Sequence, residues 1–131
     1  MPKVKLEEEY ATRMESHGWV FPLIGCRVYD ADTLMDLQLD LGFGLTFTTT
    51  GRLFGINAPE VRGKEREAGI RSREWLQAEL DAAEEVTIKT IGVESRAQQG
   101  KFGRWLIVVF ADGVNLNEMM VWKGMAETAM Y

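Results

Sequence analysis

The feature that most limits the fold is a regular alternation of apolar and polar residues between positions 35 and 41. Leucine or methionine occupies every second position, and the residues between are polar: Met35, Leu37, Leu39 and Leu41 against Asp36, Gln38 and Asp40. A period of two is that of a β-strand with one buried face and one solvated face. Residues 42–44, Gly-Phe-Gly, tolerate the positive φ of a tight turn, and residues 45–56 favour a returning strand. The region therefore predicts a β-hairpin. Its Gly-x-Gly opens no helix, so it does not indicate a dinucleotide site.

Apolar, β-branched and aromatic runs predict further strands over residues 19–29, 86–91 and 105–110. Apolar positions three and four apart predict an amphipathic helix over residues 65–83. A last helix is expected over residues 118–123, with Asn117 as its N-cap and Gly124 at its C-terminal end. We therefore expect a mainly β chain with helices (α+β), whose five strands close into a small barrel of the oligonucleotide/oligosaccharide-binding (OB) type.

The composition indicates a single domain and argues against a broad basic surface for binding polyanions. A length of 131 residues, with 46% hydrophobic and 27% charged residues, suits a single compact domain. The net charge of −5 argues against a broad basic surface, so any site for a polyanion must be local. One basic cluster is visible, and it follows Glu60 with acidic residues interleaved: Arg62, Lys64, Arg66, Arg71 and Arg73. Such a cluster could steer a phosphate backbone, although a solvated surface is the simpler interpretation.

The first 18 residues differ from the rest of the chain. Residues 1–18 are expected to form an arm or a short helix, and residues 19–131 the folded domain. The start of the chain has no apolar stretch behind a basic segment, so it does not resemble a secretory signal. No apolar run approaches the roughly 20 residues that span a bilayer. We therefore expect no membrane association and a cytoplasmic location, while secretion and the oligomeric state stay open.

Several polar residues are expected at strand ends, where a rigid scaffold can present them to a ligand. Pro59 has no backbone donor, so the strand before it must stop, which leaves Asn57 and Glu60 at its end. Asp30 and Asp32 fall between two strands, and there their carboxylates could hold a hard cation. Each of these segments, taken alone, is more typical of an ordinary turn.

Three motifs in a fixed order resemble the staphylococcal nuclease (thermonuclease) family. They are Asp30-Ala-Asp-Thr, the stretch from Arg52 to Glu60 (Arg-Leu-Phe-Gly-Ile-Asn-Ala-Pro-Glu), and Lys101-Phe-Gly-Arg; Asn117-Glu and Gly124-Met-Ala follow them. The resemblance covers about residue 20 to the end of the chain. It implies a five-stranded barrel and a calcium-dependent nuclease that hydrolyses phosphodiester bonds of DNA and RNA.

The resemblance also implies a role for each motif residue. Arg52 and Arg104 match two catalytic arginines, and guanidinium groups suit the charge that builds up when water attacks a phosphodiester. Glu60 matches a catalytic glutamate that orients or deprotonates the attacking water. The implied calcium ligands are the Asp32 carboxylate, Asn57 and the Ala58 carbonyl, with Asp30 acting through water. The implied substrate-binding residues are Lys101, Phe102 and Tyr131, and the implied partners are single-stranded DNA and RNA.

The chain departs from the family pattern at points that bear on activity. Asn57 stands where the family has a metal-binding aspartate, so we expect weaker calcium binding or a preference for another divalent ion. The family's nucleotide-stacking tyrosine corresponds to Met130, and Tyr131 is the nearest ring. The chain also ends soon after its second expected helix. These departures leave one alternative, a barrel with weakened catalysis that binds nucleic acid or protein.

Overall fold

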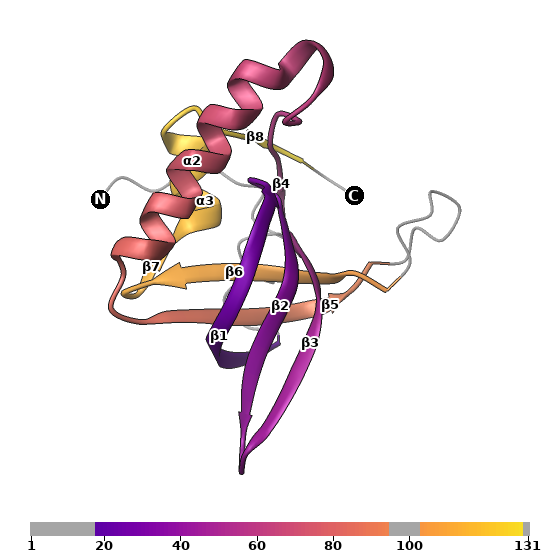
Figure 1. Ribbon diagram of the computed structural model, residues 1–131, viewed down its shortest axis with the longest axis vertical. Coiled ribbons are helices and arrows are strands. Elements are labelled where there is room, and N and C mark those ends of the chain that lie inside the picture. The colour runs from indigo at the N-terminus through magenta and orange to yellow at the C-terminus, as the bar shows by residue number, and fades with distance from the viewer. Residues whose placement is uncertain (1–17, 95–102, 130–131) are drawn as a thin grey trace.

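The computed structural model describes residues 18–94 and 103–129, which fold into a β-barrel with helices at one end (Figure 1). Five strands form the barrel: β1 (Trp19–Asp30), β2 (Thr33–Gly42), β3 (Leu45–Leu53), β5 (Val86–Val93) and β6 (Trp105–Ala111). Their order is β3-β2-β1-β5-β6, and β3 also pairs with β6, which closes the sheet. The predicted five-stranded barrel is thus confirmed.

Shorter elements complete the described chain. Three two-residue strands are present: β4 (Ile56–Asn57), β7 (Val114–Asn115) and β8 (Glu127–Thr128). The helices are the 3-10 turn η1 (Gly63–Glu65), α2 (Arg66–Ala82) and α3 (Leu116–Trp122). The returning strand predicted over residues 45–56 is in fact divided, because Gly55 adopts a φ of 81° and turns the chain between β3 and β4. No described helix is both long and apolar enough to cross a lipid bilayer.

The barrel closes where β3 and β6 run parallel for three residues. Gly51 pairs with Trp105, Arg52 with Leu106, and Leu53 with Ile107. A side chain at position 51 would require its neighbours to shift, because a Cβ there would lie 2.6 Å from Ile107 Cδ1. Paired residues of neighbouring strands point to the same face of a sheet, so this register places Arg52 near the start of β6, where Arg104 lies.

The alternation that predicted β2 holds for only part of the strand. Leu37 and Leu39 are buried as expected, but Leu34 is fully buried and Met35 is not. A bulge is responsible, because Asp36 has a φ of 50° and the β2–β3 register shifts between Leu34 and Leu37. An extra residue in one strand reverses which side chains face the core. Beyond the bulge the predicted pattern holds at Leu37 and Leu39 but fails at Leu41, which is exposed near the end of β2. Before the bulge the phase is inverted.

The cap of α3 also differs from the expectation. Asn115, not Asn117, accepts the backbone N–H of Glu118 at the helix start. Asn117 is completely buried, and its side-chain oxygen accepts the N–H of Val109 while its amide donates to the carbonyls of Phe54 and Ile107. Its side chain therefore ties α3 to β6 and to the turn after β3. Gly124 ends the helix as predicted, with a φ of 75°.

Helix α2 packs against the backbone of the predicted catalytic glutamate. A Cβ at Gly69 would lie 2.0 Å from the Glu60 carbonyl oxygen, so the two segments touch without room for a methyl group. Ser72, one turn further along α2, donates to the Met125 carbonyl at 2.7 Å. The helix thus fixes the backbone position of Glu60 from one side.

We expect Gly69→Ala to destabilise the protein and to impair any function of Glu60. Alanine is normally better than glycine in a helix by about 1 kcal/mol, so a loss of stability would show that the contact with the Glu60 backbone outweighs helix propensity. Thermal unfolding measures the effect, with Gly25→Ala as control, because a Cβ at Gly25 meets nothing within 4 Å. A Gly69→Ala protein more stable than the wild type would contradict the contact.

Candidate functional site

The ends of several strands surround one cleft of about 490 Å³ on the side of the barrel that carries the helices. Six of the predicted site residues line it: Asp32, Arg52, Asn57, Ala58, Glu60 and Arg104. Asp30, Thr33, Pro59 and Glu65 line it as well, together with residues 124–127. The predicted substrate-binding residues Lys101, Phe102 and Tyr131 lie outside the described residues. The six described positions therefore lie around one cleft.

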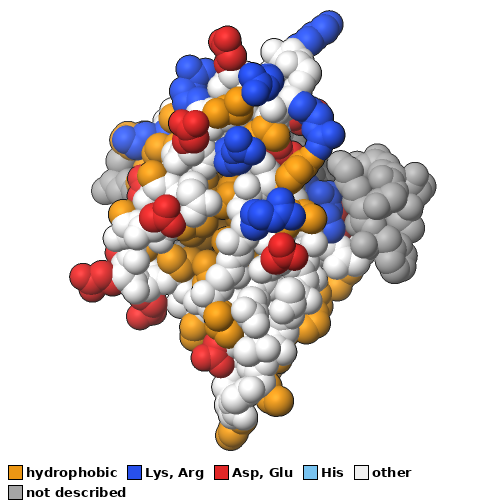
Figure 2. All heavy atoms as spheres, viewed as in Figure 1, with side chains coloured by type: hydrophobic (Ala, Val, Ile, Leu, Met, Phe, Trp, Pro, Cys, Tyr) orange, Lys and Arg blue, Asp and Glu red, His pale blue; other side chains and the backbone are white. Residues whose placement is uncertain are grey.

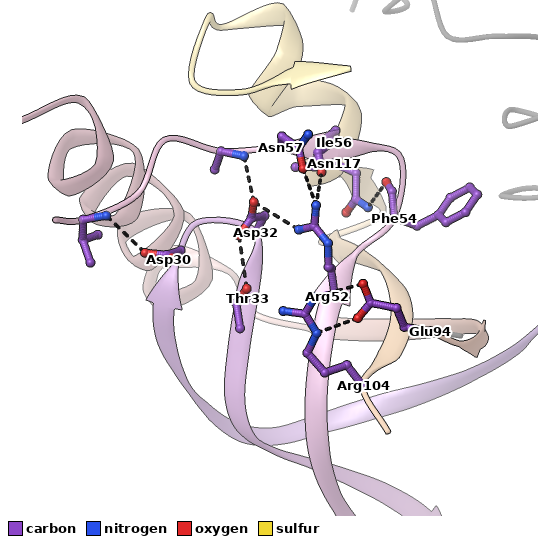
Figure 3. A network of polar contacts seen from close by, with 12 residues as sticks. Asp30, Asp32, Thr33, Arg52, Phe54, Ile56, Asn57, Glu94, Arg104 and Asn117 are labelled. Carbon is purple, nitrogen blue, oxygen red and sulfur yellow. Dashed lines mark hydrogen bonds and ion pairs between the residues drawn. The ribbon is translucent and has the colours of Figure 1, made fainter. Parts of the chain in front are cut away.

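Arg52 lies in the middle of a polar network at the end of β3 (Figure 3). Its guanidinium contacts Asp32 Oδ2 at 3.1 Å, donates to the Ile56 carbonyl at 3.2 Å, and donates to the Asn57 side-chain oxygen. Arg52 is 8% exposed, so these bonds form largely out of water, where charge-assisted bonds are strong. The guanidinium is thereby fixed in one orientation.

Asp32 is held from three directions. Its Oδ2 accepts the Ala58 N–H at 2.9 Å in addition to the contact with Arg52, and its Oδ1 accepts the Thr33 hydroxyl at 3.1 Å. The bond to Ala58 links the β1–β2 turn to the strand end that carries Glu60. One carboxylate thus fixes the relative position of two of the three motifs.

Arg104 is paired with a carboxylate that the sequence did not single out. Its Nε contacts Glu94 Oε2 at 2.6 Å and its Nη2 contacts Oε1 at 2.9 Å, which is the two-pronged arrangement favoured by arginine and carboxylate. Glu94 is 7% exposed, whereas Arg104 lines the cleft. Glu94 precedes a polar segment with no recognisable motif, so no local signal could have identified it. Its geometry leaves one guanidinium nitrogen of Arg104, Nη1, outside the pair.

The motif positions and their convergence agree with a comparison to known families. A family model described as staphylococcal nuclease homologue matches residues 50–131. The chain belongs to this family. No curated protein matches it. The matched residues include Arg52, Glu60 and Arg104, and the motif with Asp30 and Asp32 lies before them.

Glu60, for which the sequence predicts a catalytic role, is exposed and lines the cleft. Within residues 18–94 and 103–129, no hydrogen bond or ion pair to its carboxylate is formed. The nearby Asp30 accepts the Val61 N–H at 3.2 Å, which holds the segment after Glu60 against the β1–β2 turn. The Glu60 side chain is thus attached to a fixed backbone while its carboxylate faces solvent.

The cleft is acidic overall, although two arginines line it. Its carboxylates outnumber its guanidiniums, and they are Asp30, Asp32, Glu60, Glu65 and Glu127 against Arg52 and Arg104. Burial raises the pKa of Asp30 above its usual value, and the neighbouring charges of Asp32 and Glu60 raise it further, against the opposite effects of the Val61 N–H and Arg73. The excess of carboxylates repels an anionic ligand such as a phosphate unless a cation enters the cleft with it.

The cleft contains oxygen ligands of the chemical type that a hard divalent cation prefers. Asp32 and Asn57 offer side-chain oxygens and Ala58 a carbonyl, and Ca²⁺ takes about six to eight oxygen ligands. The same oxygens of Asp32 and Asn57 are bonded to Arg52. Across the described residues, no three His, Cys, Asp or Glu side chains gather into a metal cluster. Water or a substrate phosphate would therefore have to complete the coordination.

We expect Asp30→Asn to stabilise the protein at neutral pH. Since folding raises the pKa of Asp30, the native state holds that proton more tightly, and the wild type loses stability as pH rises from near 3.8 through the raised native pKa. The amide keeps an acceptor for the Val61 N–H and removes the charge. Unfolding midpoints at about pH 3 and pH 7 measure the effect. The gain should appear at neutral pH and vanish in acid.

The control for this prediction is Asp40→Asn, because Asp40 also accepts a single backbone N–H, that of Gly42, at an exposed position. A stability gain that is equal at both pH values would contradict the assignment of the effect to the Asp30 charge.

Proposed function

We propose that the protein is a metal-dependent nuclease that hydrolyses phosphodiester bonds of single-stranded DNA and of RNA, with residues 19–131 as its catalytic domain. The observation that carries the proposal is the convergence of Arg52, Arg104 and Glu60 on one cleft in a member of the staphylococcal nuclease family. A barrel that merely bound nucleic acid would have no evident need for two fixed guanidiniums beside an exposed carboxylate.

In the proposed reaction the two arginines stabilise the charge that develops on phosphorus oxygens. Attack of water on a phosphodiester places additional negative charge on the equatorial oxygens, and donors fixed beforehand need no reorganisation at that moment. Arg52 and Arg104 are fixed by Asp32 and Glu94, at 3.1 Å and 2.6 Å respectively. The Nη1 of Arg104 lies outside the pair with Glu94, and in this proposal it donates to the phosphate.

Glu60 acts as the general base in this proposal. Its carboxylate is exposed and has no hydrogen-bond or ion-pair partner among the described residues, so it is available to accept a proton from water. A calcium ion held by Asp32, Asn57 and the Ala58 carbonyl would supply positive charge beside the phosphate. Asn57 supplies no negative charge, so a different divalent ion could serve equally.

Glu60→Gln and Arg104→Ala should each reduce cleavage of a fluorescent single-stranded oligonucleotide by about 100-fold or more, because each removes a group that acts in the transition state. Cleavage is measured with calcium, magnesium, manganese or a chelator. Glu67→Gln is the matched control, since Glu67 is an exposed carboxylate in the first turn of α2.

Folding of each variant is checked by circular dichroism. Retained cleavage in both folded variants would refute the assigned roles. A wild type inactive with every ion, yet able to bind the oligonucleotide, would instead identify a binding barrel.

Asn57→Asp should tighten calcium binding by on the order of tenfold, because calcium affinity rises with the charge of its ligands. Calorimetric titration of the protein with calcium measures the change. Gln38→Glu is the control, because it adds the same charge on β2 outside the cleft. Equal affinities of wild type and Asn57→Asp would show that residue 57 is not a ligand.

A further inference from the structure

A basic surface borders the cleft without belonging to it. It consists of five side chains on the segment after Glu60, on η1 and on the first half of α2: Arg62, Lys64, Arg66, Arg71 and Arg73. All are exposed except Arg73, which is half-buried. On the face seen in Figure 2, Lys and Arg side chains gather towards the end of the molecule where α2 begins, and none is visible at the distal tip of the β2–β3 hairpin. The distribution is uneven for a chain of net charge −5.

None of the five side chains of this basic surface forms an ion pair within the described part of the chain. The ion pairs Arg27–Asp36, Arg52–Asp32 and Arg104–Glu94 all lie outside the basic surface. Arg62 lies over the ring of Tyr29 at 5.4 Å, which holds its guanidinium near β1. Among the described residues, Glu65 and Glu67, which lie between these basic residues in the sequence, form no ion pair with any of the five. These five cations are therefore available to an external anion.

Three contacts place the basic surface next to the cleft. Glu65, between Lys64 and Arg66, lines the cleft. The Val61 N–H, one residue before Arg62, is bonded to Asp30 at the cleft rim. Arg73 is close enough to Asp30 to lower the pKa of its carboxyl. A single polyanionic strand could thus contact both the basic surface and the cleft.

The spacing of the charges suits a strand and not an isolated ion. Arg66 and Arg73 are seven residues apart in α2, so they share one helix face about 10 Å apart. A nucleic-acid strand carries a phosphate about every 3.4 Å along a duplex axis, so this length covers roughly three phosphates. Exposed lysines and arginines in a row bind phosphates without reading bases.

We propose that the basic surface binds the phosphates that flank the scissile bond, so that the protein prefers strands long enough to cover both the cleft and this surface over short fragments. The inference rests on the proposed function for the identity of the substrate. Beyond the proposed function, the inference states that substrates are selected by length. It also states that most of the electrostatic attraction for the strand comes from the basic surface. The acidic cleft then needs to hold a single phosphate.

The test measures binding separately from cleavage. The probe is a fluorescein-labelled oligothymidine of about twelve nucleotides, and its anisotropy is titrated with Glu60→Gln protein at several salt concentrations. Adding Arg62→Gln and Arg66→Gln should weaken binding about tenfold and reduce the slope of log K against log salt by about 1.4, or 0.7 for each phosphate contact. Arg27→Gln with Lys123→Gln removes the same charge elsewhere and should do neither.

Equal weakening by both double variants, or an unchanged salt slope in the Arg62/Arg66 variant, would overturn the proposal. With catalytically intact protein, the ratio of kcat/KM for the oligomer to that for a thymidine dinucleotide should fall about tenfold in the Arg62/Arg66 variant. If the wild type cleaves neither substrate, the nuclease assignment fails, and the anisotropy titration still decides whether the basic surface binds the strand.

Discussion

The arrangement of the cleft depends on the parallel pairing of β3 with β6. Gly51 lies in this pairing, and a Cβ there would come within 3 Å of the side-chain ends of Ile107 and Leu37, which would both have to shift. The same junction is held by Asn117, whose buried side chain bonds to backbone groups on β6 and after β3. Loss of such a buried amide would leave several backbone groups unpaired, each at a cost of about 1–3 kcal/mol. Closing the barrel and bringing Arg52 towards Arg104 are therefore one structural event.

The two arginines are fixed by the same physical means, although their carboxylate partners have different origins. Asp32 reaches Arg52 from the β1–β2 turn, whereas Glu94 reaches Arg104 from the end of β5. Burying a charge is costly unless its hydrogen bonds are made, and no buried side-chain polar atom of the described residues lacks a partner. The guanidiniums thus lose freedom before any ligand arrives. Restriction of this kind is what a site that stabilises developing charge requires.

The strand ends could be predicted from the sequence because they depend on neighbouring residues. The features that the sequence did not predict depend on contacts between residues far apart in the chain. Pro59 and the glycines of the 42–44 turn fix the backbone by their own geometry, so the hairpin and the strand end were predictable. The bulge at Asp36 and the burial of Asn117 depend on partners far along the chain, such as Phe54, which is 63 residues from Asn117. The pairing of Glu94 with Arg104 could not be predicted from the sequence for the same reason, because it depends on where Arg104 lies in the folded chain. The roles of Arg52, Glu60 and Arg104 remain predictions, and what the structure adds is their common location.

The charge balance gives the amide at position 57 a physical meaning in the proposed nuclease. Each arginine of the cleft is already offset by a carboxylate, so the cleft has no surplus positive charge for a phosphate. A divalent cation would supply it, and an aspartate at position 57 would hold that cation more strongly. The same aspartate would also add to a group of carboxylates in which Asp30 already has a raised pKa, because of burial and then of its acidic neighbours. In the proposed nuclease, Asn57 would thus reduce the repulsion of an entering phosphate at the expense of metal affinity. The basic surface beside the cleft would favour the same anionic strand from outside.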